Sequence, residues 1–169
     1  MNTVKILKTY ISEISVNEVS SLLNTKHSLK VAICNTNTVI RSYRDETLGK
    51  IINSFDIKTP DGFPIAKSSS ILYNNNQRRV DGYNVLLTTI REGLEKNTSH
   101  YFFGSEDYIL KKVIQNLEKD FPLINIVGSL SPPVTEFNKL TEEQYIQDIQ
   151  NVNPDIVWVS LGFPKQEMF

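Results

Sequence analysis

The stretch HYFFGSEDYILKKVIQNLEKDFPLINIVG, residues 100–128, decides the fold. Its first residues are mostly apolar up to Gly104 and predict a short buried strand. The segment that follows repeats apolar residues at helical spacing, which predicts a helix with Ser105 as N-cap and one inward face. The inward residues are expected to be Ile109, Leu110, Val113, Ile114 and Leu117. The run LINIVG then predicts a second strand that ends at Gly128.

The same alternation extends in both directions from this stretch. On the carboxyl side, TEEQYIQDIQNV predicts a helix capped by Thr141 and Gln144, and DIVWVSLG predicts the last strand. On the amino side we expect a helix opened by a capping box of Ser15 and Glu18, a strand LKVAIC, and a helical stretch over about residues 38–55. A further helix, YNVLLTTIREGLEK, has Val85, Leu86, Ile90 and Leu94 on one side.

Near-continuous apolar strands that alternate with helices are typical of a parallel sheet covered on both faces. We therefore predict a single α/β domain over residues 1–169, Rossmann-like, with a mostly parallel sheet and helices on both faces. The 169 residues include 40% apolar and 22% charged residues, ordinary values for a globular protein. The net charge of −1 gives no basic excess, so a nucleic-acid partner is not expected.

The single cysteine and the lack of long apolar stretches indicate where in the cell the protein is expected. The one cysteine, Cys34, lies in an apolar run and is expected to be a buried thiol. No apolar stretch approaches the length that spans a bilayer, and Lys5 and Lys8 interrupt any signal-peptide core. A cytoplasmic location follows as the default.

The last loop, GFPKQE, offers a cation, an amide and a carboxylate in Lys165, Gln166 and Glu167. Ligands of such sheets bind beyond the carboxyl ends of the strands. Gly104, Gly128 and Gly162 are each expected to close a strand at that edge, next to this loop. The three polar groups suit a nucleotide-sugar, whose diphosphate, base and hydroxyls all need hydrogen bonds.

Three further motifs each allow a functional interpretation and a purely structural one. In TPDGFPIA, Asp61 is a positioned general base or part of a plain surface turn. In QRRVDGYN, Arg78 and Arg79 are a solvated pair or a phosphate-binding fork, with Asp81 as a possible helix cap. The helix start after Gly104 has anion-binding geometry, but the acidic residues of its first turn favour ordinary capping.

Taken in order, these motifs resemble the WecG/TagA/CpsF family of bacterial glycosyltransferases. The matching segments cover nearly the whole chain: Asn35, DGFP at 61–64, RV with Gly82, FFG at 102–104, IVGSLSPP at 126–133 and PDIVWVSLGFPKQE at 154–167. The final motif is the most specific of the set.

The resemblance implies an inverting transfer of a hexose such as N-acetylmannosamine from a UDP donor to a lipid-linked acceptor sugar, in cell-surface polysaccharide or teichoic acid synthesis. It implies Asp61 as the catalytic base. The substrate-binding residues that it implies are Asn35, Thr36, Arg79, Asn84, Gly104, Gly128, Lys165, Gln166 and Glu167. The chain departs from the family pattern at Ile33, where threonine is common, and at Asn84, where aspartate is common. These departures bear on sugar specificity.

Family members continue beyond PKQE with a segment that contacts the membrane, so the resemblance implies a truncated chain. We expect a protein peripheral to the inner face of the plasma membrane in its full-length form, and possible self-association through an exposed apolar patch. The chain has no Asp-x-Asp motif, and we expect neither a metal nor another cofactor. The alternative is a non-catalytic module that binds nucleotide-sugar. An NAD-dependent oxidoreductase is disfavoured because the glycine fingerprint is missing.

Overall fold

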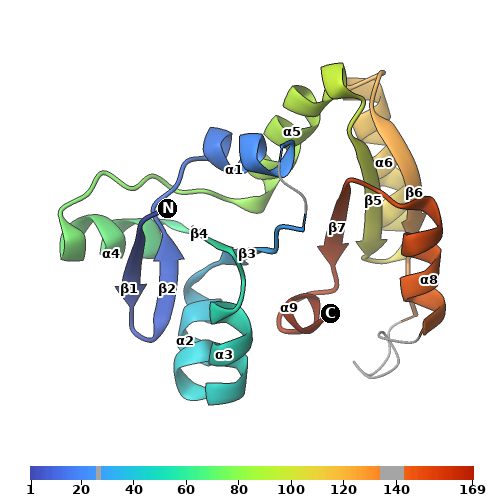
Figure 1. Cartoon of the computed structure of the whole chain (residues 1–169). Coiled ribbons are helices and arrows are strands. Elements are labelled where there is room, and N and C mark those ends of the chain that lie inside the picture. Colours follow the sequence, from blue (N-terminus) through green and yellow to red (C-terminus); the bar gives the residue numbers. More distant parts are fainter. Residues whose placement is uncertain (26–27, 134–142) are drawn as a thin grey trace. The chain divides into compact units, whose positions relative to one another are not determined.

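The computed structural model describes residues 1–25, 28–133 and 143–169. The chain forms two compact units, Met1–Thr89 and Ile90–Phe169, and each is described by itself. Both units combine helices with parallel strands, which confirms the predicted α/β class (Figure 1). No helix within the described ranges is long and apolar enough to cross a membrane.

The first unit is built around a parallel strand pair and an antiparallel hairpin. Its elements are β1 (Thr3–Ile6), β2 (Thr9–Ser12), α1 (Val16–Leu23), β3 (Val31–Cys34), α2 (Thr36–Arg44), α3 (Glu46–Asn53), β4 (Ile57–Pro60) and α4 (Phe63–Tyr73). The strands β3 and β4 pair in parallel with Cys34 opposite Pro60, while β1 and β2 form the hairpin. The capping box of Ser15 and Glu18 at α1 is confirmed.

The helical stretch predicted over about residues 38–55 is present, but Asp45 divides it into the two helices α2 and α3. This residue has extended backbone angles and its side chain accepts a hydrogen bond from the N–H of Leu48, 3.0 Å away, so α3 starts anew. Gly49 permits the two helices to approach closely: a Cβ there would lie 2.7 Å from the carbonyl oxygen of Ser42.

The helix α5 (Gly82–Gly93) and the short 3-10 helix η1 (Leu94–Lys96) lead into the second unit. Val85 and Ile90 are buried as predicted, whereas Leu86 and Leu94 are half-buried. The remaining elements are β5 (Ser99–Gly104), α6 (Asp107–Asp120), β6 (Asn125–Leu130), α8 (Glu143–Val152), β7 (Ile156–Ser160) and α9 (Lys165–Met168). The predicted cap Thr141 lies outside the described residues.

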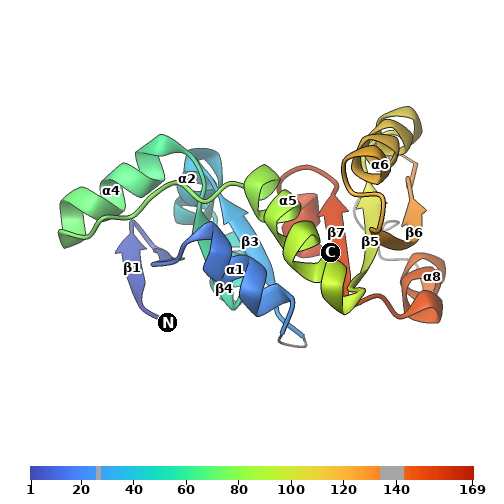
Figure 2. The same ribbon diagram turned by 90° about the horizontal axis from the view of Figure 1, so that it is seen from above.

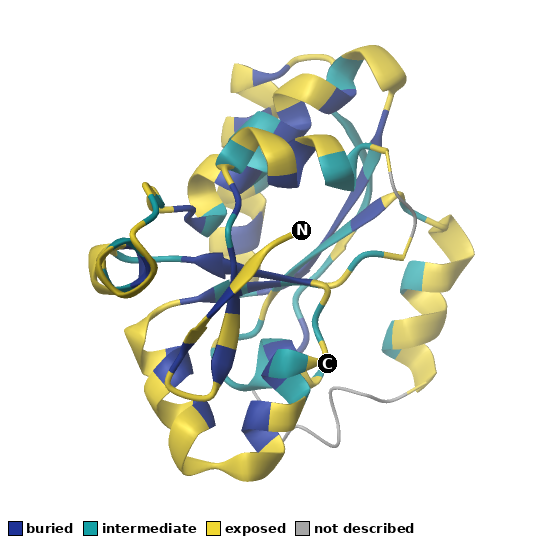
Figure 3. Ribbon diagram, turned by 60° about the vertical axis from the view of Figure 1, so that its left-hand side comes forward, coloured by how far each residue is buried: buried dark blue, intermediate teal, exposed yellow. Residues whose placement is uncertain are grey.

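The sheet of the second unit has the strand order β6-β5-β7, and all its pairs are parallel. The chain moves from β5 to one neighbour through α6 and then to the other side through α8. Right-handed crossovers in opposite directions place the two helices on opposite faces of the sheet, as Figure 2 shows. Burial in this sheet is highest on the central strand β5, while β6 and α8 contain no buried residue. Figure 3 shows where the buried residues lie along the ribbon.

Two expectations for the helix α6, its N-cap and its buried face, are wrong in detail. The N-cap of α6 is Glu106, because the N–H of Ser105 still donates to the carbonyl of Ser160 at 2.7 Å and so continues the strand pairing. On α6 only Leu110 and Leu117 are buried. Ile114 is half-buried, and Ile109 and Val113 are exposed.

Gly128 does not close a strand, since β6 continues to Leu130. Tyr101 of β5 explains the glycine: a Cβ at position 128 would lie 2.6 Å from its Cε2. The hydroxyl of Tyr101 donates to the carboxylate of Asp148, and burial raises the pKa of this tyrosine, with the Asp148 bond adding to the effect.

His100, next to Tyr101 on β5, is also buried and titratable. Its Nδ1 accepts a hydrogen bond from the indole Nε1 of Trp158 at 3.2 Å, so the ring is held unprotonated at that nitrogen. Burial lowers the pKa of His100 from 6.5 to about 4, although the charge of Asp155 acts in the opposite direction.

We predict that the free energy of unfolding falls as the pH drops from about 6.5 toward 4. The unfolded chain takes up the His100 proton first, so stability is full above the unfolded pKa and is lost toward the folded pKa. Denaturant unfolding at several pH values measures this, with NMR titration of the ring. A His27→Gln variant assigns the signal, because the chain has two histidines. A His100 pKa near 6.5 in the folded protein would contradict the prediction.

Candidate functional site

The candidate site of the first unit surrounds Asp61, which directly follows β4. Its backbone N–H donates to the carbonyls of Cys34 and Thr59, each at 3.0 Å, so the turn is fixed by main-chain bonds. Gly62 follows with φ +85°, a conformation that glycine adopts at little cost. The Asp61 carboxylate is thus placed at the carboxyl end of the strand pair, where α4 begins.

Arg79 reaches this carboxylate from 18 residues further along the chain. Its Nε donates to Oδ1 of Asp61 at 3.1 Å, and the side chain of Asp61 is only 19% exposed. The N–H of Val80 donates to the carbonyl of Pro60 at 3.1 Å, which holds the Arg79 segment beside β4. Within the described ranges, Oδ2 of Asp61 has no hydrogen-bond partner, so one oxygen remains available for a ligand.

A clamp of amide side chains, Gln77 and Asn75, positions the Arg79 segment. Oε1 of Gln77 accepts from the N–H of Ile14 at 3.1 Å, and its Nε2 donates to the carbonyl of the same residue at 2.8 Å. Asn75 donates to the Glu13 carboxylate and to the hydroxyl of Ser69. The sequence analysis did not predict these contacts. The one sequence feature that could have indicated them is the run of amide residues NNNQ at 74–77.

Asn35 and Thr36, both predicted to bind substrate, follow β3. Because Cys34 lies opposite Pro60 in a parallel pair, Asn35 and Asp61 leave neighbouring strands at the same edge. Both Asn35 and Thr36 are exposed. Oδ1 of Asn35 accepts from the N–H of Thr38 at 3.1 Å, so this side chain caps α2 and leaves its amide NH₂ group for a ligand.

Asn84, which is also predicted to bind substrate in this unit, is engaged with the helix cap. Asp81 accepts from the N–H of Asn84 at 3.1 Å and from its side-chain amide at 2.7 Å, which confirms Asp81 as the cap of α5. Burial raises the pKa of Asp81, but the Asn84 hydrogen bonds and the charge of Arg79 outweigh it and lower the pKa overall. An aspartate at position 84 would repel this carboxylate.

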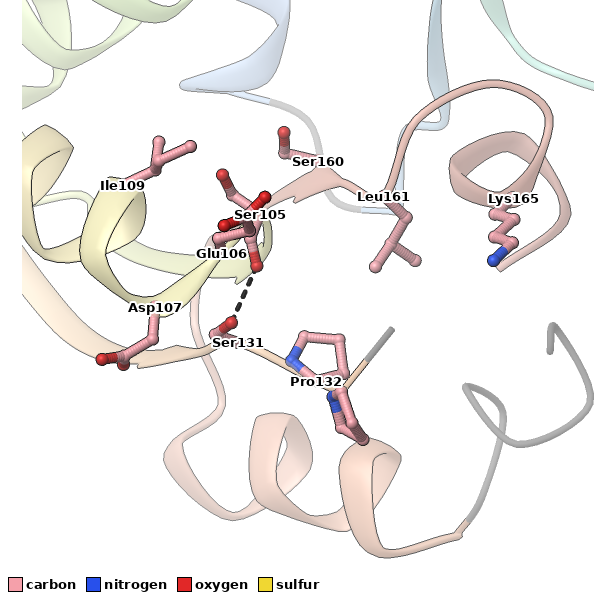
Figure 4. Close-up of a pocket in the computed structure, with 10 residues that line it drawn as sticks. Ser105, Glu106, Asp107, Ile109, Ser131, Pro132, Ser160, Leu161 and Lys165 are labelled. Carbon is pink, nitrogen blue, oxygen red and sulfur yellow. Dashed lines mark hydrogen bonds between the residues drawn. The ribbon is translucent and has the colours of Figure 1, made fainter. Parts of the chain in front are cut away.

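A separate candidate site in the second unit is a pocket of about 470 Å³ at the carboxyl edge of the β6-β5-β7 sheet. The loops after all three strands line it, through Ser105, Ser131 and Ser160 (Figure 4). The hydroxyl of Ser131 donates to the carbonyl of Ser105 at 2.7 Å and ties two of these loops together. The other lining residues are Glu106, Asp107, Ile109, Pro132, Pro133, Leu161 and Lys165.

The two glycines predicted to contact substrate have packing roles in this unit, and neither lines the pocket. Gly104 has φ +113°, and a Cβ there would lie 2.3 Å from the carbonyl oxygen of Ser160. Gly128 accommodates the Tyr101 ring. Any contact with substrate would come from their backbones.

The three polar residues of the PKQE motif are placed differently. Lys165 lines the pocket, while Nε2 of Gln166 donates to Oε1 of Glu167 at 3.0 Å. Glu167 is buried, and its Oε2 has no partner among the residues that the structure describes. Burial raises the pKa of Glu167, although the bond from Gln166 opposes this. A buried carboxylate oxygen without a donor is costly unless a ligand or a proton satisfies it.

The structure therefore brings Asp61, Arg79 and Asn35 to one sheet edge of the first unit. It places Lys165 in a pocket at the corresponding edge of the second unit. The sequence also predicts that Asp61, Arg79, Gly104 and Gln166 line one cleft at the carboxyl edge of the sheet, because each follows a strand or begins a helix there; this stays a prediction. No group of three metal-ligating side chains occurs within the described ranges, and independence from metal also stays a prediction.

Comparison with known proteins relates this geometry to characterised relatives. The chain is 27% identical over 119 residues to an N-acetylglucosaminyldiphosphoundecaprenol N-acetyl-beta-D-mannosaminyltransferase from Bacillus spizizenii, covering 70% of this chain and 44% of that protein. It is 25% identical over 147 residues to the protein of the same name from Bacillus subtilis, covering 87% of this chain and 56% of that protein. The chain thus spans about half the length of these curated relatives.

Residues 4–169 match the family described as the glycosyl transferase WecG/TagA/CpsF family, which agrees with the order of motifs in the sequence. The match includes both sheet edges and every predicted site residue. Because it extends over nearly the whole chain, the protein belongs to the WecG/TagA/CpsF glycosyltransferase family.

Proposed function

We propose that the protein transfers an N-acetylmannosamine-like hexose from a UDP-sugar to an acceptor sugar linked to a polyprenyl diphosphate. The observation that carries the proposal is the Asp61–Arg79 ion pair at the end of β4. A partly buried carboxylate with one oxygen free is the group that a general base requires. The names of the relatives in Bacillus support the sugar and the acceptor class.

In this proposal, Oδ2 of Asp61 takes the proton of the acceptor hydroxyl while the hydroxyl oxygen attacks the anomeric carbon. The bond between that carbon and the oxygen of the β-phosphate breaks. UDP leaves with the bonding electron pair and therefore with one more negative charge. Attack from the side opposite the leaving group inverts the configuration. Arg79 orients the carboxylate of Asp61 by donating to its Oδ1. The remaining N–H groups of the Arg79 guanidinium can donate to the phosphate and stabilise the negative charge that develops there.

The pocket of the second unit is the proposed nucleotide site. Glu106 and Asp107 would repel a phosphate but can accept hydrogen bonds from ribose hydroxyls. Lys165 lies at the other side of the pocket opening and suits the diphosphate (Figure 4). A substrate contact of Glu167 stays a prediction, because its side chain is buried and does not line the pocket.

We expect Asp61→Asn to reduce turnover by about 10²–10⁴-fold, the usual contribution of a general base. The substitution keeps an oxygen that can accept from Arg79, so the loop geometry and UDP affinity should persist. The assay combines UDP-N-acetylmannosamine with an undecaprenyl-diphosphate-linked N-acetylglucosamine acceptor.

Asp120→Asn, on exposed α6 surface, is the matched control for this assay. Near-normal turnover of the Asp61 variant would show that the residue only forms a turn. Binding of UDP with no transfer by the unaltered protein would favour the non-catalytic module instead.

Lys165→Met should weaken UDP binding by roughly tenfold and uridine binding little, because a charge-assisted hydrogen bond to phosphate contributes about 1.5–3 kcal/mol. Isothermal titration with UDP, uridine and NAD measures this, and Lys112→Met on the exposed side of α6 is the control. Equal losses for UDP and uridine would place Lys165 away from the diphosphate.

Glu167→Gln should stabilise the protein at neutral pH relative to the unaltered chain. The folded pKa of Glu167 is raised above the ordinary 4.5, so the stability linked to its proton is full below that value. This stability is lost as the pH rises through the folded pKa. Denaturant unfolding of both proteins across this range should show curves that diverge above pH 4.5, and parallel curves would contradict the burial of an ionisable Glu167.

A further inference from the structure

The outer face of α4 is apolar and exposed. Phe63 is 72% exposed, Ile71 68% and Leu72 64%, although the helix belongs to a packed unit. A surface helix ordinarily turns polar residues outward. Apolar side chains grouped on an exposed face mark a contact site for another molecule.

The helix is docked firmly by its other side, so this exposure does not result from a loose end. Ile65, Ala66 and Ser69 are buried against the first unit. At the end of the helix, the hydroxyl of Tyr73 accepts from the N–H of Lys5 at 3.0 Å and donates to its carbonyl at 2.8 Å. Figure 1 shows α4 beside the hairpin strand β1. The apolar face is therefore held outward by the fold.

Phe63, Lys67 and Ile71 follow each other at four-residue spacing and form one stripe on this face. The helix begins two residues after Asp61, and its 11 residues span about 16 Å. Starting at the proposed base, the stripe presents an aromatic ring, then an exposed cation, then aliphatic side chains that include Leu72.

We propose that this stripe binds the acceptor: Phe63 contacts the sugar, Lys67 pairs with the diphosphate, and Ile71 and Leu72 contact the prenyl chain. The inference rests on the proposed function. The order of the groups along the stripe supports it, because such an acceptor has, in the same order, a sugar, a dianionic diphosphate and an apolar tail. The sugar hydroxyl must reach Asp61, so the tail has to leave along a neighbouring surface.

A second copy of the chain fits this face less well. In a two-fold contact centred on the stripe, two Lys67 ammonium groups would approach each other, and the stripe contains no carboxylate to pair with them. Burying an unpaired charge in this way is unfavourable. A diphosphate removes that difficulty, because it brings its own negative charge.

The test is co-sedimentation of the protein with phosphatidylcholine vesicles, with and without undecaprenyl diphosphate. We expect binding only to the vesicles that contain the diphosphate. The double substitution Ile71→Ser with Leu72→Ser should weaken it at least about tenfold, given the apolar carbons removed from the lipid contact. Lys67→Gln should weaken it about fivefold, the equivalent of one lysine near an anionic surface.

Leu123→Ser is the matched control, since Leu123 is 78% exposed in the second unit and should leave vesicle binding unchanged. Circular dichroism checks that each variant is folded. Equal binding to both kinds of vesicle, or full binding by the double variant, would overturn the inference. So would a double variant that loses a dimer in sedimentation velocity while it keeps its vesicle binding.

UDP titration of the same samples separates this inference from the proposed function. Variants that keep UDP affinity and lose vesicle binding support the role of α4. An unaltered protein that binds UDP but no diphosphate-containing vesicle overturns the role of α4 and leaves the nucleotide site standing. An unaltered protein that binds no UDP counts against the proposed function itself.

Discussion

Parallel strand pairing is the constraint on which both units depend. Parallel strands all end at one edge of their sheet, so every segment that leaves a strand starts from that edge, whatever its distance along the chain. The pairing of β3 with β4 brings Asn35 and Asp61 together in this way. The central position of β5 between β6 and β7 does the same for Ser105, Ser131 and Ser160. The polar chemistry collects at these edges because the strands themselves are apolar and buried.

Much of the fold could be predicted because the signals are local. The capping box at Ser15, the apolar run of β5 and the helical spacing of α6 each specify an element within a few residues. The failures come from tertiary contacts. The break at Asp45 depends on a cap and on a close helix approach, and the N-cap of α6 moves because Ser105 is paired with Ser160. The hairpin of β1 and β2 and the helix α4 were not predicted, since their short segments lack a clear period.

The candidate site was predictable in its residues but not in their contacts. The motif order identified Asp61 and Arg79, and the structure shows that their side chains form an ion pair. No sequence pattern indicated that Gln77 holds the backbone of Ile14, because the two are 63 residues apart. Likewise, nothing in the sequence distinguished Lys165, which lines a pocket, from Glu167, which is buried two positions later. Burial is a property of the whole fold, so adjacent polar residues can end in unlike surroundings.

The contact of Gly128 with Tyr101 has a consequence for how such sequences can diverge. The two residues lie on adjacent strands and divide one fixed volume, nearly all of which the ring occupies. A mutation that enlarges position 128 alone would meet the ring, and one that shrinks position 101 alone would leave a void and free Asp148 of its hydroxyl donor. Either step is unfavourable by itself, so the two positions should drift together or not at all.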